Sequence, residues 1–146
     1  MLDYYLIRKV IGPPGYTGQL AATYAELVRF LGEESSIPAT LARKLAIEAE
    51  GAAEVIPRAE RLDSALHDLT RKDVGNRPAY DREEFVEDSL AIERIEPGRI
   101  WFERGIGPFE VPEEVSAESE TGWEVWIAAA PAEGKWHLLE CGMVYP

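Results

Sequence analysis

The sequence predicts an α+β protein in which a small N-terminal unit of about three helices is packed on, or linked to, a small C-terminal antiparallel β-barrel. Two observations support this class. Apolar residues recur at helical spacing between residues 18 and 72, and from Ser89 onward they alternate as in strands, with turn signals every 8 to 12 residues. Because closure removes exposed strand edges, we expect an SH3-like or OB-like barrel.

Three apolar stripes with offsets of three and four residues predict the helices. The stripes are Leu20, Tyr24, Leu27 and Leu31; Ile37, Leu41, Leu45 and Ala49; and Val55, Ala59, Leu62, Leu66 and Leu69. Thr17 and Ser36 are the expected N-caps of the first two helices, and Gly32 and Gly51 are their expected ends. Pro57 lies near the expected start of the third helix. Because helices this short are marginal alone, we expect all three stripes to be buried.

The segments that flank the helices set the expected domain boundary. Residues 4–11 are expected to form a strand or extended arm, and residues 72–79 are the expected linker. Asp81 is a possible cap of a short helix that runs to Val86. We therefore assign residues 1–80 to the helical unit with its arm and residues 81–146 to the barrel, with one cooperative domain as the alternative.

Alternation in the C-terminal half predicts which residues share a face of the sheet. The expected pairs and triplets are Leu90 and Ile92; Ile100 and Phe102; Phe109 and Val111; Trp123, Val125 and Ile127; and Trp136 and Leu138. Pro97 and Gly98 suit the centre of a type II turn. Residues 116–122 are expected to form a mobile acidic loop, and the apolar end of the chain is expected to close the sheet.

Composition and charge exclude several function classes. The chain has 146 residues and a net charge of −12, and residues 85–146 hold 13 acidic but only four basic residues. Because nucleic-acid affinity comes largely from Lys and Arg, this half argues against DNA or RNA binding. The single cysteine, the lack of a targeting segment and the lack of a membrane-length apolar run favour a cytoplasmic protein without a membrane partner.

The residues that usually carry catalysis form no recognisable constellation. Cys141 and His137 would share a face of one strand about 13 Å apart, too far for thiolate activation, and His67 is expected at the surface of the third helix. No zinc, calcium, phosphate-loop or His-Glu-x-x-His motif is present, so we expect neither a metal nor a cofactor. The short element Glu133-Gly-Lys135 is interpreted as a turn rather than as part of a nuclease site.

A run of glutamates offers a carboxylate pair but no means to separate their pKa values. Glu113 and Glu114 lie near Glu110, Glu118 and Glu120. Acid–base chemistry requires burial or a close neighbour, and an exposed loop provides neither. We expect a solvated loop, with docking of cations or of a basic protein as the functional alternative.

The tryptophans give the most informative signal. Trp123 and Trp136 are expected in the barrel core, since they share faces with apolar residues. Trp101 shares its expected face with Glu103, and Trp126 shares its expected face with Glu124. Either the helices cover these two rings, or the four residues Trp101, Glu103, Glu124 and Trp126 form an aromatic and acidic binding patch.

The sequence does not decide whether the protein is an enzyme, although it favours a non-catalytic role, and three functions stay open. The first is a non-catalytic protein-binding or regulatory module whose partner is a protein with a basic surface. The second is a small-ligand binder or hydrolase with a pocket between helices and barrel, built on Glu110 or Glu124 with Tyr or Arg. The third is DNA binding through the helical unit, where Arg43 and Lys44 follow a short turn. The oligomeric state is not predicted.

Overall fold

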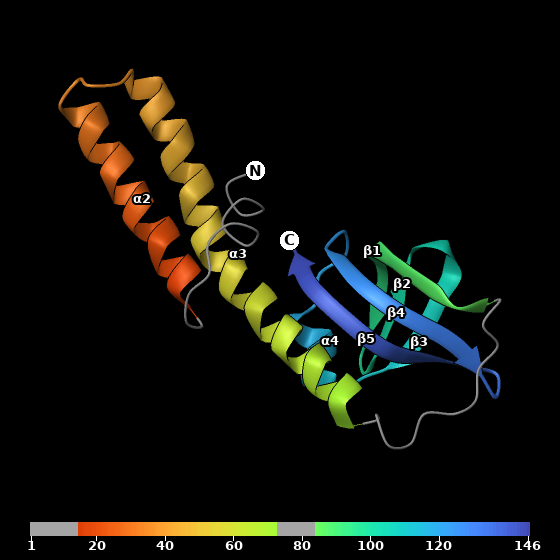
Figure 1. Ribbon diagram of the computed structural model, residues 1–146. Helices are drawn as coiled ribbons and strands as arrows, with labels where there is room; N and C mark the ends of the chain where they lie inside the picture. The colour runs from red at the N-terminus through yellow and green to blue at the C-terminus, as the bar shows by residue number, and fades with distance from the viewer. Residues whose placement is uncertain (1–14, 73–83) are drawn as a thin grey trace. The chain divides into compact units, whose positions relative to one another are not determined.

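The computed structural model describes residues 15–72 and 84–146 (Figure 1). Its elements are α2 (Tyr16–Glu33), α3 (Ala39–Lys72), β1 (Val86–Glu96), β2 (Arg99–Phe102), the 3₁₀ turn η2 (Glu103–Gly105), β3 (Ile106–Glu110), α4 (Glu113–Glu118), β4 (Glu124–Ala132) and β5 (Lys135–Tyr145). The predicted α+β class, with helices first and antiparallel strands second, is confirmed.

The expected N-terminal arm, nearly all of the linker and the expected capping position Asp81 lie outside the described residues. Val86 begins β1 and does not end a helix. The chain divides into two compact units, Met1–Glu60 and Arg61–Pro146, with the boundary inside α3.

The expected second and third helices are one helix, α3, which is 34 residues long. Gly51 does not end it, and Pro57 lies inside it. Glycine and proline cost about 1 and 3 kcal/mol in a helix interior relative to alanine. The alanine-rich sequence around Gly51 has high helix propensity, which offsets these costs, and Gly51 has a helical backbone and open space around its Cα. The predicted break at Gly51 was therefore wrong.

In the first unit, α2 and α3 pack through small side chains. Ala21, Ala25 and Val28 of α2 are buried, as are Ala42 and Ala49 of α3. The helices approach so closely that a Cβ added at Gly32 would lie 2.6 Å from the Cβ of Ala42. The stripe that we expected to be buried lies beside this contact, and Leu27 within it is 50% exposed. Small residues form this contact because they allow the two helix backbones to come close.

The N-terminus of α2 is capped from the other helix. The Glu60 carboxylate accepts a hydrogen bond of 2.8 Å from the backbone N–H of Gly15 and a second one from the hydroxyl of Thr17. Thr17 lies inside α2, and Gly15 occupies the N-cap position without a side chain. The expected cap at Thr17 was wrong, because a carboxylate distant in sequence satisfies the free donors and complements the helix dipole.

The second unit contains a five-stranded antiparallel sheet in the order β3-β2-β1-β4-β5. Leu90 pairs with Val125, Ile92 with Phe102, and Ile127 with Cys141, so one face of the sheet forms the core. β3 and β5 are the edges, and between them lies a ring contact of 6.3 Å between Phe109 and Trp136. The sheet is not closed by a ladder, so the expected barrel is not confirmed.

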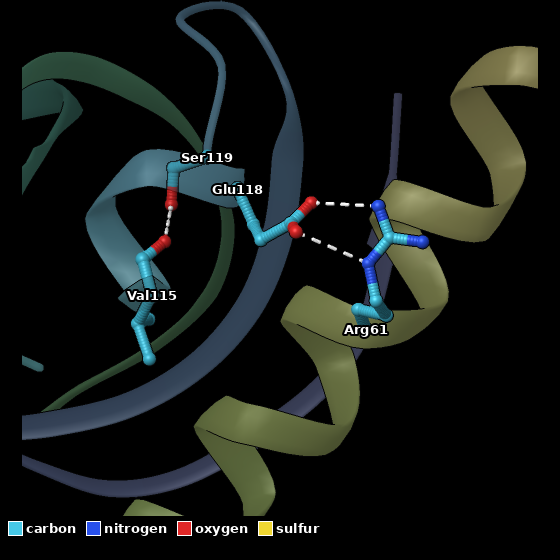
Figure 2. Close-up of polar contacts among 4 residues, drawn as sticks. All are labelled: Arg61, Val115, Glu118 and Ser119. Carbon is cyan, nitrogen blue, oxygen red and sulfur yellow. Dashed lines mark hydrogen bonds and ion pairs between the residues drawn. The ribbon is translucent and has the colours of Figure 1, made fainter. Parts of the chain in front are cut away.

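Residues 61–72 of α3 and the short helix α4 also belong to this unit. Leu62 and Leu66 are almost completely buried. Arg61 donates two hydrogen bonds, of 3.1 and 2.9 Å, to the carboxylate of Glu118 on α4 (Figure 2). This bidentate pair connects the two helices at the surface.

α4 replaces part of the expected mobile loop. Val115 is buried, and the Ser119 hydroxyl donates to the Val115 carbonyl oxygen at 2.8 Å (Figure 2). Ser116 accepts a hydrogen bond from the backbone N–H of Gly98 at 3.0 Å. A six-residue helix with one apolar anchor has no periodicity that the sequence reveals.

Candidate functional site: the outer face of the sheet

Both candidate tryptophans lie on the outer face of the sheet, which we define as the face opposite the core. Trp126 on β4 pairs with Ser89 of β1, and Trp101 on β2 pairs with Arg94, which is also on β1. Both positions alternate with core residues such as Leu90. The offset of five residues from Ser89 to Arg94 corresponds to roughly 16 Å along β1 at about 3.3 Å per residue. The two rings therefore share a face without forming one cluster.

Trp101 is occupied by an internal partner. The guanidinium carbon of Arg94 lies 3.7 Å from the centroid of the Trp101 ring, in cation–π geometry. On β3, a Cβ at Gly107 would lie 3.2 Å from Cδ1 of Trp101, so the glycine leaves room for the indole. Trp101 is half-buried by these neighbours, which reduces its value as an anchor for a partner.

The two candidate glutamates are placed differently. Glu103 is exposed in the turn η2, where the chain has left the strand, so it does not continue the face of Trp101. Glu124 is exposed at the first position of β4, two residues before Trp126 on the same face. Of the predicted set, the structure brings together Glu124 and Trp126 and separates Glu103 from Trp101.

A β-bulge in β5 lies opposite Trp126 and determines which residues surround it. Val125 pairs with Val144 and Ile127 with Cys141, so Gly142 and Met143 both lie opposite Trp126. A Cβ at Gly142 would lie 3.1 Å from Cε3 of Trp126, which shows how closely the indole packs on this backbone.

Met143 is 47% exposed at this bulge. Strand alternation alone would not reveal it as a neighbour of Trp126, because the bulge changes the register.

We call the resulting surface the Trp126 patch. It consists of half-buried Trp126 and Tyr145, exposed Met143, and the exposed carboxylates Glu124 and Glu140, all from β4 and β5. Glu124 pairs with Tyr145, and Glu140 pairs with Ala128 of the outer face. The patch is apolar at its centre and acidic at its margin.

His137 and Cys141, both on β5, are not placed as a catalytic dyad. His137 pairs with Ala130 and Cys141 pairs with Ile127, so a second β5 irregularity places them on opposite faces. Our expectation that they share a face was wrong, although the conclusion that they form no dyad stands.

Cys141 instead lies near Asp63 and Thr70 of α3. Burial and the charge of Asp63 raise the pKa of the thiol to about 12. Such a thiol stays protonated at neutral pH and is a poor nucleophile.

A polar cluster on α3 accompanies Cys141. His67 Nδ1 lies 3.0 Å from the Asp63 carbonyl oxygen and 3.5 Å from Asp63 Oδ1, but that buried carboxylate oxygen has no hydrogen bond within the described part of the chain. Burial raises the pKa of Asp63, and the neighbouring His67 opposes the shift.

A cavity of about 550 Å³ lies between β3 and β5. Its lining includes Arg99, Glu110, Lys135, Trp136 and His137. Lys135 Nζ lies 3.3 Å from Glu110 Oε1, and both side chains are mostly exposed. Glu110 therefore lacks the burial that a carboxylate acid or base requires.

Comparison of the chain with protein families, with curated proteins and with solved structures finds no match in any of the three. Within residues 15–72 and 84–146, no group of three or more His, Cys, Asp or Glu side chains is placed to hold a metal ion. None of the described helices combines the length and apolar character needed to cross a membrane.

Proposed function

We propose that this chain is a non-catalytic protein-binding module that uses the Trp126 patch. The observation that carries the proposal is that the indole of Trp126 packs on the backbone of Gly142. Half-exposed Met143 lies at the same bulge, and the carboxylates of Glu124 and Glu140 lie at the margin. Tryptophan is enriched at binding hot spots, and methionine adapts to the shape of a partner.

The chemistry of the patch indicates the kind of partner. An apolar side chain flanked by Lys or Arg would contact the centre and the acidic margin together, and the net charge of −12 would steer a basic protein toward it. The inert thiol of Cys141 and the exposure of Glu124 support a role without catalysis.

The test is capture of partners from lysate, with and without nuclease treatment, using the tagged full chain and two single variants. We expect Trp126→Ala to lose the partner and Trp101→Ala to retain it, since Arg94 already covers the Trp101 ring. A double change of Glu124 and Glu140 to Lys should slow association and reduce its salt dependence. Equal capture by wild type and Trp126→Ala, with both proteins folded, would refute the proposal. Capture that disappears with nuclease would revive DNA binding through Arg43 and Lys44.

A small anionic ligand in the cavity between β3 and β5 is the second candidate function. Arg99, Lys135 and His137 line this cavity together with the ring of Trp136, although the second unit is acidic overall. A thermal-shift screen with anionic metabolites tests it. Stabilisation that is lost in Arg99→Ala but kept in Trp126→Ala would favour this cavity over the patch.

We propose that the sheet is an OB-like barrel left open between β3 and β5, with an SH3-like barrel as the alternative. The strand order and the position of α4 between β3 and β4 support the OB-like form. The contact between Phe109 and Trp136 supports the nearness of the two edges. Nuclear Overhauser contacts between backbone protons of β3 and β5 would test closure. A cytoplasmic location stays part of the proposal.

A further inference from the structure

The exposed apolar side chains of the described residues are concentrated on the helical hairpin, which we define as α2 with residues 39–60 of α3. Five of the six large apolar side chains that are exposed in residues 15–72 and 84–146 belong to it. Leu27 and Leu41 are 50% and 43% exposed, while alanines fill most of the contact between the helices. The hairpin thus buries mostly small residues, with Ile56 as a large exception, and leaves several large apolar side chains exposed or half-buried.

Two of the exposed side chains, Leu27 and Leu41, lie on one side of the hairpin, whereas Ile47 lies on the other side with Arg29 and Glu50. Arg29 of α2 forms an ion pair with Glu50 of α3, which marks one side. Leu20 is nine residues from Arg29, and Leu41 is nine residues from Glu50. At about 100° per residue, nine residues correspond to about 180°, so Leu20 and Leu41 both lie on the side opposite the ion pair.

The spacing on this side is that of a helical bundle seam. We define the hairpin face as Leu20, Tyr24, Leu27 and Leu31 of α2 with Leu41 and Leu45 of α3. The offsets of four, three and four on α2, and of four on α3, keep these residues in line along both helices. None of the six is charged, so a partner of opposite charge is not what the face selects.

We propose that the hairpin face binds the hairpin face of a second copy of this chain, forming a two-fold symmetric four-helix bundle. The 18 residues of α2 span about 27 Å, and two helices 8–10 Å apart make a face about 20 Å wide. That corresponds to about 500 Å² per chain and about 1,000 Å² in the dimer, the smallest area typical of a specific interface. A self-complementary seam on both helices suits this symmetry, since each hairpin supplies the same two rows of side chains.

The experiment measures the mass of the full chain by sedimentation equilibrium at several concentrations. We expect a dimer of twice the 16.3 kDa chain mass. Leu27→Glu and Leu41→Glu, tested separately, should each weaken dimerisation about 100-fold or more, because each substitution enters the interface twice. Ile47→Glu is the matched control: Ile47 is 59% exposed and lines the groove that contains Arg29 and Glu50.

Each outcome decides the proposal. A monomeric wild type overturns it. A dimer that survives both Leu27→Glu and Leu41→Glu, or that Ile47→Glu disrupts equally, also overturns it. Helical circular dichroism confirms that the variants fold, which is expected because glutamate is a good helix former at an exposed position. Trp126→Ala should leave the dimer intact, so failure of this proposal and of the binding proposal are distinguishable.

Discussion

Alkylation of Cys141 tests directly whether this chain has a usable thiol. Because it is the only cysteine, its reaction rate has a single origin. Burial, reinforced by the charges of Asp63 and Glu140, raises its pKa to about 12, and the contact with Thr70 only partly opposes this. We expect the native protein to react far more slowly with a thiol reagent than the unfolded chain.

The size of the effect follows from the thiolate fraction. At pH 8 an ordinary thiol with a pKa of about 9 is roughly 10% ionised, whereas a pKa of about 12 leaves roughly 0.01%. Ionisation alone therefore slows the reaction about 1,000-fold. The native rate should rise about tenfold per pH unit from pH 8 to pH 11 without levelling near pH 9.

The assay follows the colour of an aromatic disulfide reagent with native protein and with protein in guanidinium chloride. Asp63→Asn should accelerate the native reaction, because the charge of Asp63 helps to raise the thiol pKa. A native rate within about tenfold of the unfolded rate would refute the argument and reopen a nucleophilic role for Cys141. Since the folded pKa lies above the unfolded one, the protein should also lose stability as the pH rises from about 9 through 12.

Three further predictions concern stability and are checked by urea denaturation. Asp63→Asn should stabilise the protein at pH 7 by about 1 kcal/mol and have no effect at pH 3. The reason is that the buried carboxylate, whose pKa is raised, costs stability only when it is ionised. Equal gains in stability at both pH values would contradict this cause. Gly51→Ala should stabilise by about 1 kcal/mol, since Gly51 lies exposed inside α3, and a loss would show that the helix breaks there. Gly142→Ala should destabilise by about 1 kcal/mol and weaken partner binding by moving Trp126, and unchanged binding would contradict the packing described above.

The sequence predicts the strands better than the helices because strand alternation depends only on neighbouring residues. The face that contains Leu90, Ile92 and Phe102 is as expected. The helical stripe was misassigned because hydrophobicity favours leucine, whereas close helix approach requires alanine and glycine. Ala21 and Gly32 therefore fill positions that periodicity alone gives to larger residues.

The candidate site was predicted in part for a similar reason. Trp126 and Glu124 lie on one face because β4 is regular between them. Glu103 does not lie on the face of Trp101 because the chain turns directly after β2. Met143 lies opposite Trp126 because β5 has a bulge there. Turns and bulges arise from tertiary packing, which a period-two pattern does not encode.

The two proposed surfaces together predict how the protein would bind an immobilised partner. A dimer formed through the hairpin face carries two Trp126 patches, so binding to a dense surface gains avidity that binding to a single partner in solution does not. Leu27→Glu should therefore weaken binding to the surface and leave solution affinity unchanged, whereas Trp126→Ala should weaken both. If Leu27→Glu lowers solution affinity as much as surface binding, the hairpin face itself contacts the partner, and assembly and recognition are not separate.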